Sequence, residues 1–245
     1  MTTPLGLISS LDLSQFLDLS DVRTQSHTTP YGDPSSKLVH ATLADQPLVL
    51  LQRHGTQQQI PPHKINYRAN LWALKEVGVQ QVIGIATVGG IHPDLGPGSL
   101  CIADQLIDYT YGREHTYATT LNGSVGHIEF GEPFCARLRA SLITAAQQSD
   151  IACTAQGVYG ATQGPRLETA AEIRRMQRDG CDLVGMTGMP EASLAREAGL
   201  RYANLSLVVN WAAGLESQPI DFSQVKHYQT TGMQQVLTII QHICQ

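Results

Sequence analysis

Hydrophobic residues gather in short continuous runs along the chain, and glycine, proline or polar residues bound most of these runs. Such runs are typical of strands that are covered on both faces of a sheet. The pattern predicts strands over residues 6–8, 48–51, 82–88, 100–107, 158–161, 183–186 and 205–209.

Between several of these runs, hydrophobic residues recur at helical spacing. Leu71 and Leu74 lie within residues 69–77, and Gly78 follows where a helix would end. Strands that alternate with helices favour the α/β class, so we expect one domain over residues 1–245 with α/β/α layers. Similar patterns predict helices over residues 168–178, over 190–198, and around 233–240.

The charge balance argues against nucleic acid or an anionic membrane as a partner. The chain carries 16 Lys plus Arg against 21 Asp plus Glu, a formal net charge of -5, with no basic cluster. No hydrophobic run approaches the length of a membrane span, and the apolar stretch at residues 5–8 is too short for a signal peptide. We therefore expect a soluble, cytoplasmic protein.

The five cysteines are odd in number, lie far apart and form no C-x-x-C pair. This usage is typical of reduced, buried thiols in a cytosolic protein. A catalytic cysteine is the less favoured alternative, because free cysteine most often packs as a small hydrophobic residue.

Two strand ends carry groups suited to an anion. Arg53-His54-Gly55 follows the run 48–51, and an arginine fork matches a phosphate in bidentate fashion. The alternative is a loop arginine that pairs with an acid. The run 82–88 ends in Ala86-Thr87-Val88-Gly89-Gly90, whose small residues and backbone N–H groups could cradle an anion or simply form a tight turn.

Three further segments place polar groups at turns. Thr162–Glu168 precedes a predicted helix, where Glu168 could serve as an ordinary partner of the helix dipole. Met186 and Thr187 lie at a strand-to-helix turn. Asn210 follows the run 205–209, at the end of a strand where α/β sheets bind ligands, and its amide both donates and accepts hydrogen bonds.

Several classes of site are absent from the sequence. There is no H-E-x-x-H motif, and no two histidines stand three or four residues apart, so we expect no metal. There is also no G-x-G-x-x-G motif and no P-loop. A nicotinamide dehydrogenase and a nucleoside triphosphatase are therefore disfavoured.

Several motifs along the chain match the pattern of one known family, namely Arg53-His54-Gly55, residues 62–75, His127, Glu132-Pro133, residues 162–166 and residues 185–191. Over nearly its whole length the chain resembles the trimeric purine nucleoside phosphorylase family, in the branch that contains methylthioadenosine phosphorylases. The resemblance implies a mixed central sheet, a homotrimer that sometimes pairs into a hexamer, and no cofactor besides phosphate as co-substrate.

The family's chemistry is attack of phosphate on the anomeric carbon of a nucleoside while the purine leaves, through an oxocarbenium-like transition state. The resemblance implies that Asn210 and His54 are catalytic, that Met186 contacts the ribose, and that Leu167 packs on the base. It also places His127 near the 5′ substituent, in a pocket shared between subunits. The implied phosphate contacts are Arg53, His54, Ala86, Thr87, Thr187 and, in the altered loop described below, Ser9.

The position that reads the base departs from the adenine-specific pattern. Adenine-specific members carry an Asp at the position of Asn210 and a second Asp at the position of Ala212. An amide can donate to O6 of a 6-oxopurine, and no carboxylate remains here to protonate N7 of adenine. The chain therefore most resembles the subgroup that acts on S-methyl-5′-thioinosine, with general 6-oxopurine or methylthioadenosine phosphorylases as alternatives.

The phosphate loop also departs from the family. A Gly-Gly-Thr-Gly loop normally follows the first strand, whereas this chain has Ser9-Ser10-Leu11-Asp12. An Asp12 side chain that pointed inward would repel phosphate, and one that pointed outward would cost much less. Three functions therefore remain open: a phosphorylase with a modified loop, a nucleoside hydrolase, and a weakly active nucleoside-binding protein. Retention of Arg53, His54, Thr87 and Thr187 favours the first.

Overall fold

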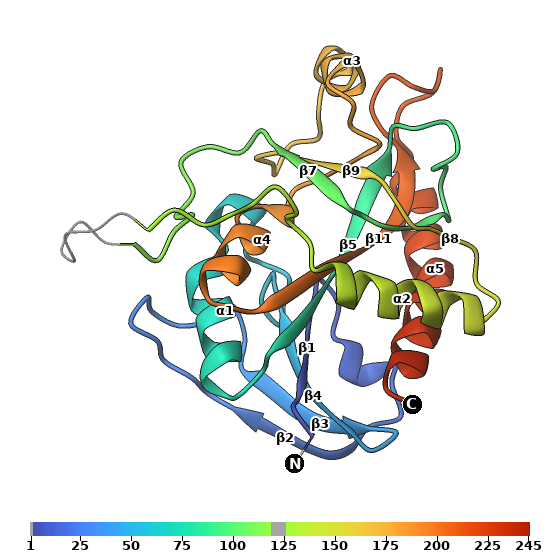
Figure 1. Ribbon diagram of the computed structural model, residues 1–245. Helices are drawn as coiled ribbons and strands as arrows, with labels where there is room; N and C mark the ends of the chain where they lie inside the picture. Colours follow the sequence, from blue (N-terminus) through green and yellow to red (C-terminus); the bar gives the residue numbers. More distant parts are fainter. Residues whose placement is uncertain (1, 119–125) are drawn as a thin grey trace.

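The computed structural model describes residues 2–118 and 126–245. Within these residues the protein is built around one sheet of eleven strands (Figure 1). The strands are β1 (Leu5–Ser9), β2 (Ser20–Gln25), β3 (Leu38–Leu43), β4 (Gln46–Gln52), β5 (Gln81–Gly90), β6 (Leu100–Ile102), β7 (Gln105–Asp108), β8 (Cys153–Thr154), β9 (Val158–Ala161), β10 (Leu183–Gly185) and β11 (Arg201–Trp211).

The sheet is mixed, as the family resemblance implies. Its main path runs β2-β3-β4-β1-β5-β10-β9-β7, and β11 joins β5 to β6, which pairs with β8. The central strands β4, β1, β5 and β11 are parallel, whereas β10 runs antiparallel to β5. Because the parallel strands end at the same edge, the segments that follow β1, β4 and β5 and the end of β11 meet there.

Helices cover both faces of the sheet, which confirms the three-layer α/β/α arrangement. In Figure 1, α1 and α4 lie on one side of the central strands, α2 and α5 lie on the other, and α3 stands apart. The helices are α1 (Tyr67–Glu76), α2 (Ala136–Gln148), α3 (Ala170–Arg178), α4 (Gly188–Glu197) and α5 (Phe222–Ile243), with short 3-10 turns at η1 (Leu13–Gln15) and η2 (Pro62–Lys64).

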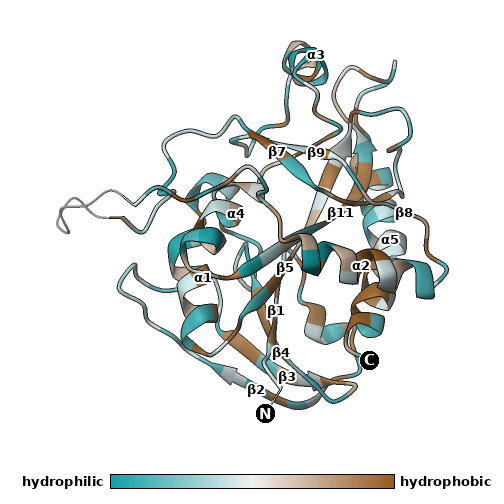
Figure 2. Ribbon diagram, in the orientation of Figure 1, coloured by the Kyte–Doolittle hydropathy of each residue, from teal (hydrophilic) through white to brown (hydrophobic). Residues whose placement is uncertain are grey.

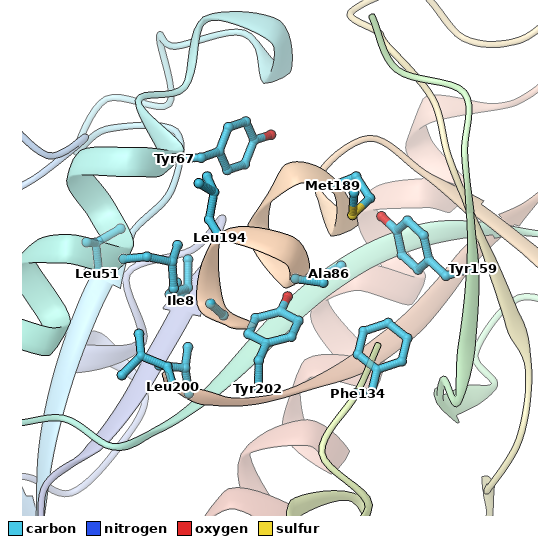
Figure 3. Packing of buried hydrophobic residues seen from close by; sticks show 14 of the residues in the cluster. Ile8, Leu51, Tyr67, Ala86, Phe134, Tyr159, Met189, Leu194, Leu200 and Tyr202 are labelled. Atoms are coloured by element: carbon cyan, nitrogen blue, oxygen red, sulfur yellow. The ribbon is translucent and has the colours of Figure 1, made fainter. Parts of the chain in front are cut away.

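Each face of the sheet has its own hydrophobic core. Leu71 of α1 and Leu194 of α4 pack with strand residues on one side, part of which is drawn in Figure 3. Leu142 of α2 and Val236 of α5 pack on the other side. Figure 2 shows the hydrophobic colouring concentrated on the central strands, as burial of both sheet faces requires.

The observed elements differ from the predicted ones in two ways. One predicted strand is broken into two strands, and several observed elements were not predicted. The run 100–107 is broken: β6 pairs with β11 and β8, whereas β7 pairs with β9. Asp104 lies at the break and accepts a hydrogen bond from the backbone of Gly157 at 2.7 Å. The elements β2, β3, β8 and α2 were not among those predicted.

Candidate active site

The ends of β4, β5, β10 and β11 open onto one cavity of about 240 Å³. Cavities at such strand ends are the usual ligand sites of α/β sheets. The cavity brings together eight of the residues singled out from the sequence, namely Arg53, His54, Ala86, Thr87, Leu167, Met186, Thr187 and Asn210.

Three residues singled out from the sequence lie elsewhere. The Ser9 side chain is buried and accepts a hydrogen bond from the Leu11 backbone at 3.1 Å, so Ser10 lines the cavity in its place. Ala212 is buried in a small core beneath α3, and its neighbour Ala213 lines the cavity. His127 is exposed and is not among the lining residues of its own chain.

Arg53 is held by protein groups on almost every side. Its Nε and Nη2 atoms donate to the two carboxylate oxygens of Glu191, each at 2.8 Å. Nη1 donates to the carbonyl of Ile85 at 3.1 Å, and Nη2 also donates to that of Ile8 at 3.3 Å. The acid that could pair with this arginine is therefore present, and Arg53 ties β1, β4 and β5 to α4.

His54 is partly buried beside Arg53. Burial is the main cause that lowers the pKa of its imidazole, so the ring is neutral at pH 7. Nδ1 lies 2.8 Å from the carbonyl of Ile60, and a neutral ring must donate from Nδ1 to satisfy that carbonyl. Nε2 is then left as an acceptor, suited to the P–OH group of a monoprotonated phosphate.

The altered loop does not direct its carboxylate into the cavity. Asp12 accepts hydrogen bonds from the backbone and hydroxyl of Ser14, at 3.1 and 2.6 Å, and from Gln15 at 3.1 Å. It therefore acts as the N-cap of η1 and lines a different, smaller hollow. The sequence left the direction of Asp12 open, and the structure places it outside the cavity that Arg53 and His54 line.

We expect Asp12→Ala to change the phosphate KM by less than about twofold while it lowers stability by about 0.5–2 kcal/mol, the usual worth of an N-cap. Urea unfolding and initial rates at varied phosphate would measure the two effects. A large gain in phosphate affinity would show that the Asp12 charge does reach the site.

Arg113 fastens the loops that surround the cavity. It is 8% exposed and donates to the carbonyls of Thr162, Gln163, Met186 and Met189, at 2.6 to 3.1 Å. It also donates to the hydroxyl of Tyr67 and the amide oxygen of Gln163. One guanidinium thus joins the loop after β9 to the turn after β10.

A lysine has three donors on one atom and cannot reproduce this planar fork. We expect Arg113→Lys to lower kcat/KM for the nucleoside by roughly tenfold or more, through displacement of Met186 and Thr187. Steady-state rates and unfolding curves of both proteins would check this. Unchanged kinetics would contradict the role of Arg113 in holding the loops.

Glu168 is the site residue whose role the sequence did not reveal. Glu168 lines the cavity, and its carboxylate accepts a hydrogen bond from the Thr162 hydroxyl at 2.5 Å. Thr169, not Glu168, caps α3, through a capping box with Glu172. Glu168 therefore lies on the cavity wall and is not the residue that caps the helix. The capping-box pattern Thr169-x-x-Glu172 could have shown from the sequence that the helix starts after Glu168.

Asn210 owes its position to an irregularity in β11. The pairing with β5 shifts between Val208 and Asn210, so Val209 is an extra residue and both Val209 and Asn210 line the cavity. The Nδ2 atom of Asn210 donates to the carbonyl of Trp211 at 2.7 Å. One N–H and the amide oxygen remain for a ligand.

The outer wall of the cavity is apolar. Ile220, Phe222 and Val225 line it from the start of α5 and the segment before it, and Leu167 lines it from the loop after β9. Phe222 is 71% exposed and Leu167 is 40% exposed, unusual values for large hydrophobic residues. Such exposure at the rim of a cavity is typical of a surface that a ligand or a second chain covers.

Among the residues that the structure describes, no group of His, Cys, Asp and Glu side chains is arranged to hold a metal, and the five cysteines are all free thiols. The described part of the chain also contains no helix long and apolar enough to cross a membrane.

Fold and cavity together define a nucleoside-phosphorylase type of protein, and comparison with known proteins agrees. The sequence profile described as "Phosphorylase superfamily" matches residues 5–244, so the chain belongs to this superfamily.

Similar proteins include a probable S-methyl-5′-thioinosine phosphorylase of Xanthomonas campestris, 48% identical over 90% of this chain and 89% of the relative. A protein of Pseudomonas syringae with the same description is 44% identical over 96% and 95%. A 6-oxopurine nucleoside phosphorylase of Pyrococcus furiosus is 43% identical over 83% and 78%. Among solved structures, a mutant adenosine/methylthioadenosine phosphorylase of Schistosoma mansoni in complex with adenine superimposes with a TM-score of 0.93 at 32% identity, covering 99% of this chain and 91% of that one.

Proposed function

We propose that this protein cleaves S-methyl-5′-thioinosine with phosphate, giving hypoxanthine and 5-methylthioribose 1-phosphate. The observation that carries the proposal is that Glu168 and Asn210 line the same cavity as Arg53, His54 and the two threonines, Thr87 and Thr187. Side chains that can hydrogen-bond to the edge of a purine and side chains that can bind an anion thus line one cavity. Similarity to relatives described as acting on methylthioinosine and 6-oxopurine nucleosides supports the same conclusion.

The base preference follows from donors and acceptors. Hypoxanthine presents an N1–H donor, an O6 acceptor and, when it leaves, an N7–H donor. The Glu168 carboxylate accepts from N1–H, while Asn210 donates its remaining N–H to O6 and accepts from N7–H. Adenine would instead present the lone pair of N1 to a carboxylate. A mismatch of this kind costs up to ~10⁴ in specificity.

The reaction itself requires little covalent chemistry from the protein. A phosphate oxygen attacks C1′, the C1′–N9 bond breaks, and its electron pair moves into the purine. The purine takes up a proton from solvent at N7, and the monoprotonated phosphate releases its own proton to solvent as the 1-phosphate ester forms. Thr87, Thr187 and His54 hold the phosphate, Met186 lies against the ribose, and Leu167 packs on the base. Asn210 stabilises the departing base, so catalysis rests on positioning and electrostatics.

The apolar wall favours a methylthio group at the 5′ position. Ile220, Phe222 and Val225 offer no hydrogen-bond partner from their side chains to a 5′-hydroxyl. Burying an unpaired hydroxyl is costly, whereas burying a thioether is favourable. Methylthioinosine is therefore preferred over inosine, and a general 6-oxopurine phosphorylase is the alternative that this wall argues against.

We further propose a homotrimer, which could pair into a hexamer, located in the cytoplasm and acting without metal or cofactor. The exposed His127 lies outside the cavity of its own chain, as a residue that completes a neighbouring subunit's 5′ pocket would. Light scattering after gel filtration would give the mass. A monomer of 26.6 kDa with full activity would contradict the shared pocket.

The proposed hydrogen bond between Glu168 and the base can be tested by mutation. We expect Glu168→Gln to lower kcat/KM for methylthioinosine by roughly tenfold or more, because a charge-assisted hydrogen bond to N1–H is lost. The same variant should cleave methylthioadenosine as well as before or better, since the Gln amide can donate to N1 of adenine. Equal losses on both substrates would mean that Glu168 does not read the base.

The proposal as a whole is tested by comparing methylthioinosine, methylthioadenosine and inosine at saturating phosphate, with the free base measured by chromatography. We expect the highest kcat/KM with methylthioinosine. A preference for inosine would indicate a general 6-oxopurine phosphorylase, and a preference for methylthioadenosine would show that Asn210 and Glu168 do not set specificity.

A further inference from the structure

Behind the cavity, three buried polar side chains form one hydrogen-bonded group. Arg53, Glu191 and Tyr202 are 1%, 0% and 2% exposed. The carboxylate of Glu191 receives both bonds from Arg53 and a third from the Tyr202 hydroxyl at 2.7 Å. Figure 3 shows the Tyr202 ring between α4 and the strands, with its hydroxyl pointing toward the helix. A side chain at Gly84 would collide with that hydroxyl.

This group leaves Arg53 with little to offer a phosphate. A guanidinium has five N–H groups, and four of those of Arg53 are used by Glu191, Ile85 and Ile8. One N–H on Nη1 remains. The Glu191 carboxylate, which contacts Arg53 but does not line the cavity, also balances the positive charge.

The other ionisable groups on the cavity wall do not replace that charge. Among the described residues that line the cavity, only His54 and Glu168 are ionisable besides Arg53. His54 is neutral because burial lowers its pKa, and Glu168 is an acid. Without ligand, the wall and its buried ion pair therefore carry no net positive charge, so an incoming phosphate meets hydroxyls, backbone groups and a single N–H.

We propose that Glu191 is a positioning residue that sets the affinity of the phosphate site: it fixes the Arg53 guanidinium and cancels its charge, so that phosphate and the pentose 1-phosphate product bind weakly enough to leave. The inference rests on the proposed function and deepens its phosphate subsite. Binding that is equally strong for ground state and transition state does not raise turnover, which is the advantage of a neutralised arginine.

Stability alone does not account for Glu191. A buried ion pair is often no more stabilising than well-packed hydrophobic residues of similar volume. The Glu191 carboxylate accepts three hydrogen bonds, two from Arg53 and one from Tyr202, and these bonds hold the ion pair in one orientation. A fixed pair next to an anion site controls both the direction of the one free N–H and the local charge.

The test is a set of four proteins: wild type, Glu191→Gln, Arg53→Met, and the double variant Arg53→Met with Glu191→Gln. The dissociation constant of radiolabelled phosphate is measured by equilibrium dialysis. Removal of a buried negative charge next to an anion site should tighten phosphate binding by roughly tenfold when Arg53 is present. It should tighten binding at least as much in the Arg53→Met background, where the Glu191 charge would otherwise stand uncompensated.

The comparison between Arg53→Met and the double variant remains available if Glu191→Gln alone fails to fold. Tyr202→Phe is the matched control, because it removes one hydrogen bond to Glu191 and keeps both charges. We expect its phosphate affinity to stay within about twofold of wild type. The kinetic constants should change as well. Glu191→Gln should lower the phosphate KM, and it should also lower kcat because release of the product slows.

Weaker or unchanged phosphate binding on removal of Glu191 in both backgrounds would overturn the inference. A similar change in Tyr202→Phe would assign the effect to packing and would overturn it as well. The proposed function is judged separately, on the wild-type protein. If wild type releases base without phosphate, the proposed function fails, whereas a phosphate-dependent wild type with unresponsive variants refutes only the role of Glu191.

Discussion

Replacing Asn210 with Asp is expected to raise the kcat/KM ratio of methylthioadenosine over methylthioinosine by roughly a hundredfold. In the wild type, Nδ2 of Asn210 donates to the Trp211 carbonyl at 2.7 Å. In Asn210→Asp, a carboxyl oxygen takes the place of Nδ2 and faces the Trp211 carbonyl oxygen. Repulsion between these two oxygens raises the pKa of the carboxyl group and favours its protonated form. The proton then lies toward the Trp211 carbonyl, so the other carboxyl oxygen can accept from the N6 amine of adenine but cannot donate to O6 of hypoxanthine.

Rates with both nucleosides at fixed phosphate would measure this ratio. Asn210→Ala is the control, because it removes the hydrogen bonds that residue 210 makes to the base and leaves that of Glu168 in place, so it should lower both rates without reversing the preference. If the ratio is the same for Asn210→Asp and wild type, Asn210 does not contact the base.

Arg53→Ala is expected to have the largest effect on stability, a loss of about 3–5 kcal/mol in the free energy of unfolding. The variant leaves the Glu191 carboxylate wholly buried without its partner and releases the carbonyls of Ile8 and Ile85. The phosphate KM should also rise by at least roughly tenfold, because one donor is lost and an uncompensated negative charge remains.

Urea unfolding, followed by rates at varied phosphate under conditions where the variant is folded, would separate the two effects. The double variant Arg53→Met with Glu191→Gln should recover part of the lost stability, since no buried charge is then left alone. A small loss of stability in Arg53→Ala would show that Glu191 finds another partner or takes up a proton.

The central strands of the sheet could be predicted from local sequence patterns, whereas the strand at its edge could not. The runs that became β4, β5, β9 and β11 are hydrophobic because both faces of the sheet are covered. The strand β2 has six residues that are exposed or only partly buried, so no hydrophobic periodicity marks it. It exists because β3 pairs with it. The helix α2 carried a usable signal in Leu138, Leu142 and Ala145, which were not singled out.

Eight of the residues singled out from the sequence line the cavity, whereas the partners that hold them could not be predicted. Arg53 and Glu191 are 138 positions apart, and no local pattern could reveal that the arginine is already paired. Arg113 binds mainly backbone carbonyls, which every sequence contains. The direction of Asp12 depends on one side-chain rotamer, which is fixed by Ser14 and Gln15.

The proposed function requires that phosphate, not water, cleaves the nucleoside in this cavity. The decisive experiment is phosphorus NMR of a reaction with methylthioinosine, combined with chromatography of the base. We predict one pentose 1-phosphate for each hypoxanthine released and no hypoxanthine when phosphate is omitted. Hypoxanthine together with free methylthioribose in the absence of phosphate would identify a hydrolase, and no release under either condition would identify a nucleoside-binding protein.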